Sequence, residues 1–419
     1  MYEIAVAREK IAIIGGGAAG FFAAITCAQA NPENEVSLFE HGSEFLTKVR
    51  ISGGGRCNVT HACFDPRALT ASYPRGERAL ISPLHRFSPR DTIDWFESRG
   101  VKLKTEPDGR VFPLTDSSRT IIECLVREAK GAGVRLFKRK GIEGARRSEE
   151  EGFELDANGA AIRCDRLLLA TGGCRAPSGA QIAESLGHSI APAVPSLFSF
   201  HVSTAWLHSL PGVSVPDVEA SVQGTRLRER GPLLITHNGV SGPVILRLSA
   251  WGARILHEMD YRFVIRVNWL PELTEEEIWA ELQSLRQSHP KRHVMNSPLG
   301  SLPVRLWEQL VLAAGVDPAM LWTTLSSAAA NALVRWLRGT DLQVNGKSLN
   351  KEEFVTCGGV SLREVNFKTM ESRITPNLYF AGELLDLDGI TGGFNFQAAW
   401  TTGWIAGNAM AGVKPTTRS

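Results

Sequence analysis

The chain has 419 residues, enough for two or three domains that each bury their own core. Hydrophobic residues make up 43% and charged residues 21%, which excludes a disordered, collagen-like or coiled-coil chain. Lys and Arg number 46 against 44 Asp and Glu, and a net charge of +2 is too balanced for a general nucleic-acid or anionic-membrane binding surface. We therefore expect a small-molecule substrate, no nucleic-acid partner and no membrane.

The seven cysteines are scattered and include no CxxC pair, which argues against a secreted disulfide framework and a zinc module. We expect no metal site and a reducing, cytoplasmic location. The apolar run 11–28 follows Arg8 and Lys10 and resembles a signal peptide, but three adjacent glycines inside it favour a strand followed by a turn. No other run approaches the roughly 20 apolar residues of a membrane span.

The N-terminal region predicts a βαβ unit. Residues 10–14 have the pattern of a buried strand, 15–20 of a tight turn, 21–30 of a helix and 35–40 of a second strand. Two later apolar segments, 165–170 and 378–381, also run into glycines and predict further strands of this kind. We therefore predict an α/β fold with a Rossmann-like domain, residues 1–195 and 356–419, assembled from both chain ends.

The middle of the chain has a different pattern. Short alternating segments separated by Gly and Pro occupy about 199–270 and predict an antiparallel, barrel-like sheet. Thr274 and Glu277 form a capping box before a helix, and 304–314 and 328–338 continue at helical period. Asn345–Gly346 is typical of a hairpin turn. The predicted insertion is a β domain, residues 196–272 and 340–355, with a helical subdomain at 273–339.

Gly15, Gly17 and Gly20 form a G-x-G-x-x-G motif between a strand and a helix, and Glu40 ends the next strand. The first glycine permits the turn, the second lets backbone amides approach a pyrophosphate, and the third allows close packing of helix on strand. The helix N-terminus would stabilise the phosphate charge, and Glu40 would accept hydrogen bonds from ribose hydroxyls. A glycine-rich turn without a ligand is the alternative.

A basic, glycine-rich loop follows at Lys48–Asn58 and contains Gly53, Gly54 and Gly55 in a row. Such a loop suits the extended FAD molecule better than a nicotinamide, which usually contacts a different crossover. The alternative is a flexible, solvated loop.

The sequence resembles the BaiN/RdsA (YhiN-type) family of bacterial NAD(P)/FAD-dependent oxidoreductases, which belong to the two-dinucleotide-binding-domain flavoproteins. The resemblance rests on KVRISGGGRCNVTH, GRVFPLTDSSRTIIECL, LLLATGG, THNGVSGPVIL, CGGVSLREVNFKTMESR and LYFAGELLDLDGITGGFNFQAAWTTG, which occur in the family's order and span nearly the whole chain. It implies noncovalent FAD. It also implies that members act as bile-acid reductases, aminoacetone oxidases or other oxidoreductases.

The resemblance places a set of cofactor contacts along the whole chain. These residues are Gly15, Gly17, Ala18, Gly20, Glu40, Lys48, Ser52, Gly53, Gly54, Gly55, Arg56, Cys57, Asn58, Ile142, Thr171, Gly172, Gly173, Gly382, Glu383, Gly392, Gly393, Phe394 and Asn395. Ile142 is expected in a strand-like segment near the adenine. The last helix is expected to begin near Gly393, where its N-terminus would stabilise anionic charge on a reduced flavin.

The chemistry beyond FAD leaves alternatives open. Cys57 and Cys63 lie where disulfide-reductase flavoproteins carry a redox pair, but five residues separate them here in place of four, which disfavours a dithiol reductase. His237 sits in a glycine-flanked loop and is a weak candidate for proton transfer beside a flavin, or else it fixes its own turn. We expect hydride transfer between noncovalent FAD and a small organic substrate, with NAD(P)H as a candidate reductant. The alternative is a non-catalytic or RNA-directed flavoprotein.

Overall fold

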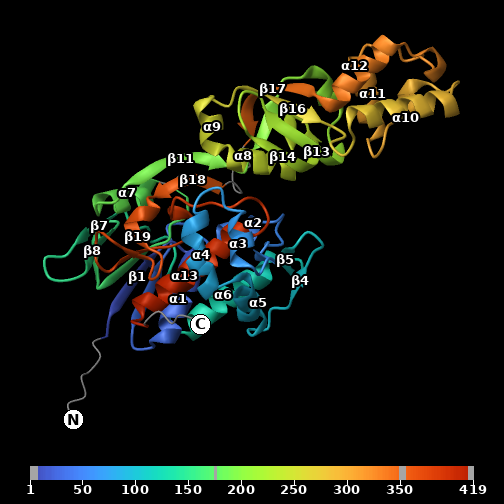
Figure 1. Ribbon diagram of the computed structural model, residues 1–419. Coiled ribbons are helices and arrows are strands. Elements are labelled where there is room, and N and C mark those ends of the chain that lie inside the picture. The colour runs from blue at the N-terminus through green and yellow to red at the C-terminus, as the bar shows by residue number, and fades with distance from the viewer. Residues whose placement is uncertain (1–7, 174–176, 349–354, 414–419) are drawn as a thin grey trace. The chain divides into compact units, whose positions relative to one another are not determined.

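The computed structural model describes residues 8–173, 177–348 and 355–413 (Figure 1). The chain forms two compact units, residues 1–195 with 351–419 and residues 196–350. The return to the first unit was expected at 355–356, and residues 349–354 just before it lie outside the described part. In the described residues no helix is long and apolar enough to cross a membrane.

The first unit is organised around a seven-stranded sheet with the strand order β19-β20-β21-β10-β1-β2-β6. The strands from β21 to β6 are parallel, and the two edge strands β19 and β20 are antiparallel. The bounds are β1 Lys10–Ile14, β2 Glu35–Phe39, β6 Arg135–Phe137, β10 Arg166–Leu169, β19 Val365–Asn366, β20 Glu371–Ser372 and β21 Leu378–Phe380. Because β1 pairs with β10 and β10 with β21, the two ends of the chain share one sheet, which confirms the predicted Rossmann-like architecture.

Smaller sheets and helices surround this sheet. The other strands of the first unit are β3 Thr60–His61, β4 Leu103–Thr105, β5 Arg110–Pro113, β7 Gly144–Arg147, β8 Phe153–Ala157, β9 Ala160–Cys164, β11 Ile190–Ser196 and β18 Val355–Val360. The helices are α1 Ala18–Ala30, α2 Thr47–Ile51, α3 Pro66–Thr70, α4 Glu77–Arg86, α5 Pro89–Glu97, α6 Ser118–Gly131, α7 Pro177–Ser185 and α13 Phe394–Met410, with short 3-10 turns η4 Leu362–Glu364 and η5 Gly382–Leu384.

Helices α1 and α13 lie against each other in the core of this unit (Figure 1). Both are rich in small and apolar residues, and both are buried on nearly every side. A Cβ on Gly403 of α13 would lie 2.5 Å from the backbone oxygen of Ala19, so the glycine is what allows the two backbones to approach so closely. α1 begins at Ala18, three residues before the predicted start, because the glycine turn ends at Gly17.

The second unit contains a closed six-stranded barrel with the order β12-β15-β14-β13-β16-β17. Its strands are β12 Ser199–Val202, β13 Ser214–Val222, β14 Arg228–Thr236, β15 Gly239–Ser241, β16 Phe263–Asn268 and β17 Thr340–Ser348. Its helices are α8 Pro243–Trp251, α9 Ala253–Glu258, α10 Glu275–Ser288, α11 Val304–Ala313 and α12 Ser327–Arg338, with turns η1 Ala205–Ser209, η2 Val294–Asn296 and η3 Trp322–Thr324. The barrel-like and helical character of the insertion is thus confirmed.

Local signals were mostly reliable in the second unit, with one error. The capping box of Thr274 and Glu277 is present at the start of α10. Asn345–Gly346, in contrast, makes no hairpin turn, because β17 runs through both residues. The partner strand pairs His201 with Gly346 and the next residue with Val344, so Asn345 sits at an irregularity in the register. The Asn-Gly dipeptide therefore occurs here at a β-bulge and not in a tight turn.

Candidate functional site

The glycine motif folds as the tight connection between β1 and α1. Gly15 has a φ of +112°, and a Cβ there would lie 2.2 Å from the backbone oxygen of Ala170 at the end of β10. A Cβ on Gly20 would lie 2.0 Å from the backbone oxygen of Gly15. The first and third glycines are therefore required by backbone packing, as their positions in the motif predict.

Gly17 differs from its two neighbours in the motif. It is the N-cap of α1, and a Cβ there would meet no atom within 4 Å. No side chain of the described residues caps this helix, and its first turn has no acidic residue. Uncapped N–H groups that point into open space at a helix N-terminus form a binding site for a phosphate anion.

Glu40 follows β2 and reaches back to this turn. One carboxylate oxygen accepts from the N–H of Gly16 at 2.9 Å, and the other accepts from the N–H of Gly42 at 2.7 Å. Each carboxylate oxygen has a second lone pair, so these bonds leave capacity to accept from ribose hydroxyls. The carboxylate is thus held in place beside the glycine turn.

The basic loop predicted at 48–58 begins as a helix, because α2 covers Thr47–Ile51 and Ser52 is its C-cap. The three glycines after it all have a positive φ, and a Cβ on Gly54 or Gly55 would meet no atom within 4 Å. One side of the loop backbone therefore faces open space. A bulky ligand could lie against it there. The Ser52 hydroxyl is used locally and donates to the Val49 carbonyl at 3.0 Å.

Lys48 connects this loop to the C-terminal part of the chain. Its Nζ lies 2.5 Å from a carboxylate oxygen of Glu383, and the other oxygen of Glu383 accepts from the N–H of Thr356 at 2.9 Å. Gly173 lies against the same group, because a Cβ there would be 2.2 Å from Thr356 Oγ1. Lys48, Gly173 and Glu383, distant in sequence, are therefore brought together, and Thr356 joins them without a sequence signal.

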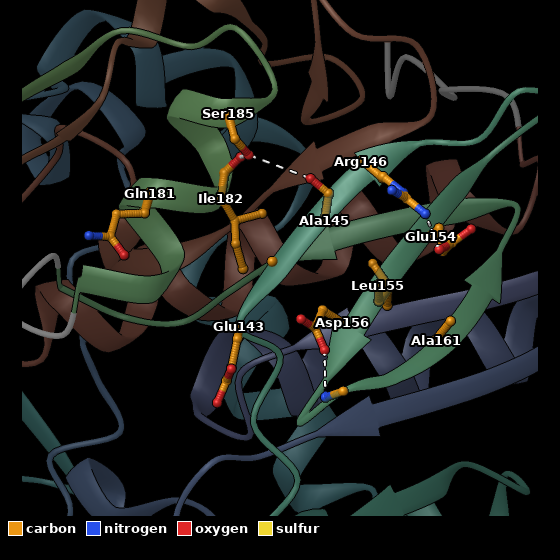
Figure 2. Close-up of a pocket in the computed structure, with 12 residues that line it drawn as sticks. Glu143, Ala145, Arg146, Glu154, Leu155, Asp156, Ala161, Gln181, Ile182 and Ser185 are labelled. Carbon is orange, nitrogen blue, oxygen red and sulfur yellow. Dashed lines mark hydrogen bonds and ion pairs between the residues drawn. The ribbon is translucent and has the colours of Figure 1, made fainter.

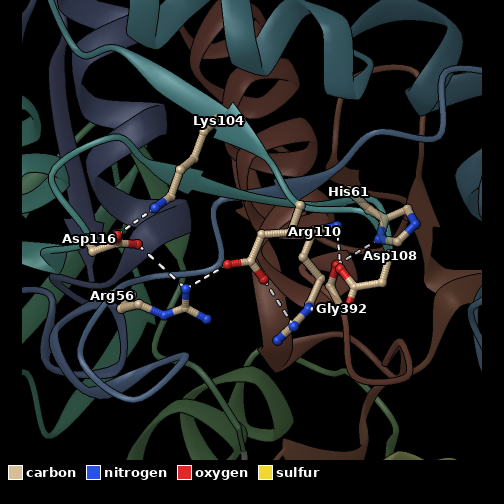
Figure 3. A network of polar contacts seen from close by, with 8 residues as sticks. Arg56, His61, Lys104, Asp108, Arg110, Asp116 and Gly392 are labelled. Carbon is tan, nitrogen blue, oxygen red and sulfur yellow. Dashed lines mark hydrogen bonds and ion pairs between the residues drawn. The ribbon is translucent and has the colours of Figure 1, made fainter.

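Arg56 is occupied by protein carboxylates (Figure 3). Its Nη1 lies 2.7 Å from Glu106 and 3.5 Å from Asp116, and its guanidinium carbon lies 3.9 Å from the centre of the Phe112 ring. Lys104 also pairs with Asp116, and this contact, followed by that of Arg56, lowers the pKa of the Asp116 carboxyl. Arg56 thus anchors the glycine loop to the β4–β5 hairpin.

The N-terminus of α13 is held by residues from the other end of the chain. Gly393 is the N-cap, and its N–H donates to the side-chain oxygen of Asn58 at 3.0 Å. The carbonyl of Gly392 lies 3.1 Å from Nδ1 of His61 (Figure 3). The His61 ring stacks on Phe394 at 4.7 Å, and the Tyr73 hydroxyl donates to the Phe394 carbonyl at 2.7 Å.

Asn395 and Gly382 have structural partners as well. The side chain of Asn395 accepts from the N–H of Gly389 at 2.9 Å and donates to its carbonyl at 2.8 Å, which closes the loop before α13. The N–H of Gly382 donates to Thr402 Oγ1 at 3.0 Å. His61 and Tyr73 were missed at the sequence level, although His61 lies three residues beyond Asn58 in the quoted motif.

Cys57 has the opposite properties to those of a redox-active thiol. Its side chain is fully buried, and burial raises its pKa to about 12, against a small lowering by Ser52. Both Cys57 and Cys63 are free thiols, and burial also raises the pKa of Cys63. A dithiol flavin reductase needs an accessible thiolate, so this geometry disfavours the dithiol alternative.

Three cofactor candidates and the weak catalytic candidate His237 remain to be placed. Thr171 and Gly172 follow β10, and a Cβ on Gly172 would meet open space. Ile142 is buried but lies before β7, so the expected strand at this residue is wrong. His237 lies in the exposed β14–β15 turn of the second unit, where its carbonyl is 3.0 Å from His208 Nδ1. This contact uses the backbone of His237 and gives no evidence that its imidazole takes part in catalysis.

A cavity of about 590 Å³ lies elsewhere on the first unit, between the β7–β8–β9 sheet and α7 (Figure 2). Part of its polar lining is paired within the protein: Arg146 contacts Glu154 at 2.5 Å, and Asp156 accepts from the N–H of Gly159 at 2.8 Å. None of the expected cofactor residues lines it. In the described residues no group of His, Cys, Asp and Glu could hold a metal ion.

The residues fit FAD at three points. The uncapped start of α1 beside Gly17 suits a pyrophosphate, and the fixed carboxylate of Glu40 suits a ribose. The open backbone of Gly54 and Gly55 suits a long planar ligand. The start of α13 has no acidic residue in its first turn, so it favours negative charge on a ligand beside it.

Residues 9–409 match the family described as HI0933-like protein Rossmann domain. The chain belongs to this family. It is 34% identical over 416 residues to the ribosomal RNA dihydrouridine synthase of Escherichia coli (strain K12), covering 97% of this chain and 99% of that protein. It is 30% identical over 411 residues to the 3-dehydro-bile acid delta(4,6)-reductase of Clostridium scindens, covering 96% and 99%. The family resemblance of the sequence motifs is thereby confirmed.

Solved structures show the same fold at low identity. A 3-ketosteroid-delta4-(5alpha)-dehydrogenase from Rhodococcus jostii RHA1 matches with a TM-score of 0.52 and 16% identity, covering 98% of each chain. The open conformation of a flavocytochrome c3 fumarate reductase matches with a TM-score of 0.50 and 15% identity, covering 97% of this chain and 78% of that one. This chain therefore has the fold of FAD-dependent oxidoreductases.

Proposed function

We propose that this chain, an FAD-dependent oxidoreductase by family and fold, reduces a carbon–carbon double bond that is conjugated to a carbonyl group. The observation that carries the proposal is the chemistry shared by two full-length relatives, one named a ribosomal RNA dihydrouridine synthase and the other a 3-dehydro-bile acid delta(4,6)-reductase. Uridine has a ring double bond conjugated to a carbonyl, and a 3-keto steroid with delta-4,6 unsaturation has the same arrangement. The two substrates differ greatly in size but undergo one reaction.

Noncovalent FAD, when bound, supplies the hydride for such a reduction, and NADH or NADPH returns it to the reduced state. The net reaction adds one hydride and one proton across the double bond and oxidises NAD(P)H to NAD(P)⁺. The chain contributes binding and electrostatics. The start of α1 and Glu40 hold the dinucleotide half, and the uncapped start of α13 stabilises negative charge on the ring system.

A uridine of ribosomal RNA is the first substrate to test. A second relative of the same name, from Haemophilus influenzae, is 30% identical over 404 residues and covers 94% of this chain. The overall charge of +2 argues against nucleic acid only if it is evenly distributed, and it is not. Residues 48–90 contain eight Lys and Arg but two acidic residues. A keto-steroid is the second candidate, because the bile-acid relative matches over the same length.

The test is a two-stage reaction under anaerobic conditions. Purified protein is first reduced by NADH or NADPH while the flavin absorbance is followed. Deproteinised ribosomal RNA from an E. coli strain that lacks its own ribosomal RNA dihydrouridine synthase is then added, and a parallel sample receives a 3-keto steroid with delta-4,6 unsaturation. We expect reoxidation of the flavin by RNA and a gain of two hydrogens in one or more uridines by mass spectrometry. Reduced flavin that neither substrate reoxidises would contradict the proposed reaction.

A further inference from the structure

The segment from residue 62 to residue 90 carries arginines that the cofactor site does not use. Arg67 on α3, Arg78 on α4 and Arg90 on α5 have exposed side chains. None of the three forms an ion pair with a carboxylate in the part of the chain that the structure describes. Phe64 is 41% exposed, and the guanidinium carbon of Arg90 lies 4.0 Å from the centre of its ring.

Other basic residues of the same segment have internal roles and so differ from these three. Arg75 pairs with the fully buried Asp388, and Arg86 donates to the Lys368 carbonyl and lies over Trp404. Of the two acidic residues in this segment, one has a local partner and the other is exposed. Asp65 caps α3 by accepting from the N–H of Ala68, and Glu77 lies in the first turn of α4. Helices α4 and α5 also carry the exposed acidic residues Glu77, Asp94 and Glu97. In the described residues none of these carboxylates pairs with Arg67, Arg78 or Arg90, so the three guanidinium groups stay available to a ligand.

The chain segment that carries these arginines contacts the start of α13. The carbonyl of Ser72 accepts from the N–H of Ile390, Tyr73 bonds to Phe394, and Arg75 pairs with Asp388. Helices α4 and α5 also contact α13 directly. The segment that presents the arginines is thus the one that fixes the loop of residues 388–394 beside the cofactor site.

We propose that Phe64, Arg67, Arg78 and Arg90, here called the arginine face, bind the backbone of a structured RNA. Unpaired guanidinium groups contact phosphates, and an exposed aromatic ring with an arginine stacked on it accepts an unpaired base. A keto-steroid has no phosphates and gains nothing from such a surface. The inference rests on the proposed function because it takes the RNA relatives as the guide to substrate class, and it adds the surface by which RNA is held.

The experiment compares two triple variants of the full-length, FAD-loaded protein. The first is Arg67→Gln with Arg78→Gln and Arg90→Gln. The matched control is Arg119→Gln with Arg146→Gln and Arg163→Gln, three exposed arginines of α6, β7 and β9 that pair with glutamates. Both variants lose three positive charges. Binding of the deproteinised ribosomal RNA is measured by filter retention between 50 and about 300 mM salt, at which electrostatic contacts with RNA weaken progressively.

We expect the first variant to bind RNA about tenfold more weakly or worse, with a slope of log affinity against log salt that is smaller by about 2 to 3. The control should retain most of its affinity. Phe64→Ala should weaken binding about fivefold or more without changing the slope, because stacking is insensitive to salt. Flavin content and the rate of flavin reduction by NAD(P)H should stay unchanged in all three variants, which shows that they are folded.

Two results would overturn the inference: wild-type protein that does not bind the RNA at physiological salt, or equal losses in the two triple variants. The outcome is separable from that of the proposed function. RNA binding that depends on the arginine face, without formation of dihydrouridine, would leave the surface standing and remove the proposed reaction. Formation of dihydrouridine at wild-type KM by the first variant would leave the reaction standing and remove the surface.

Discussion

Gly17→Val separates the binding of FAD from the folding of the domain. The Cβ at residue 17 would meet no atom within 4 Å, and its φ of −90° and ψ of −169° are open to any residue. The fold should therefore tolerate valine, at a cost of about 1 kcal/mol for a poorer N-cap. The space that valine fills is the space beside the free N–H groups of α1, which a pyrophosphate needs.

The expected loss in affinity follows from those N–H groups. A bond to a charged group contributes about 1.5–3 kcal/mol, so the loss of two amide contacts costs about 3 kcal/mol or more. This corresponds to about a hundredfold weaker binding of FAD. The measurement is titration of apo-protein with FAD, followed by flavin fluorescence, beside thermal unfolding of the apo-protein.

Two further variants complete the comparison. Gly20→Ala places a Cβ 2.0 Å from the backbone oxygen of Gly15, so it should prevent folding and not only binding. Gly131→Val at the exposed end of α6, where a Cβ also meets open space, should alter neither FAD affinity nor fold appreciably. Full flavin occupancy in Gly17→Val would refute the phosphate-binding role of this turn.

Three other outcomes are expected. Acid precipitation should release the flavin, because burial raises the pKa of the nearby Cys57 thiol to about 12 and keeps it from acting as a nucleophile; flavin retained by the precipitate would contradict this. Of Cys57 and Cys63, iodoacetamide should label Cys63 first in native protein, since Cys57 is fully buried, and equal labelling in mass spectra would be evidence against the described packing. Burial lowers the pKa of His188 below its usual 6.5, and this effect outweighs the opposite effect of Glu364. Just below pH 6.5 the native chain therefore binds fewer protons at this residue than the unfolded chain does. Stability should then fall as pH drops below 6.5, by at most about 1.4 kcal/mol per pH unit from this group, and His188→Gln should show a smaller loss of Tm between pH 7 and 5.5.

Local rules predict the framework of the cofactor site. A buried strand, a glycine turn and a helix are specified by neighbouring residues, so β1 and β2 appear in the structure at nearly the expected bounds, while the turn expected at 15–20 ends at Gly17. Gly15 and Gly20 could also be assigned a role in advance, because the motif carries a fixed steric reason for each. The start of α13 at Phe394 follows from the glycine pair before it.

The partners of the charged side chains could not be predicted in this way. Arg56 belongs to a loop that looks suited to phosphate, yet it pairs with Glu106, 50 residues away, and with Asp116, 60 residues away. Glu383 meets Lys48 across 335 residues. Such pairs depend on which loops the fold brings together. A local pattern of residue types holds no information about contacts between distant segments. The hairpin turn predicted at Asn345–Gly346 was wrong for the same reason. The register of β17 depends on the strand that faces it, and that strand is distant in sequence.

The long-range pairs also decide how the site can be tested. Five interactions from Asn58, His61, Ser72, Tyr73 and Arg75 hold the residues from Asp388 to Phe394. The remainder of α13 packs on α1 with almost every side chain buried. Truncation after Leu385 would therefore expose the core and abolish folding together with FAD binding. A substitution that fills open space, as at Gly17, blocks the ligand without disturbing the packing of the protein. It therefore tests ligand binding, whereas a truncation tests the fold.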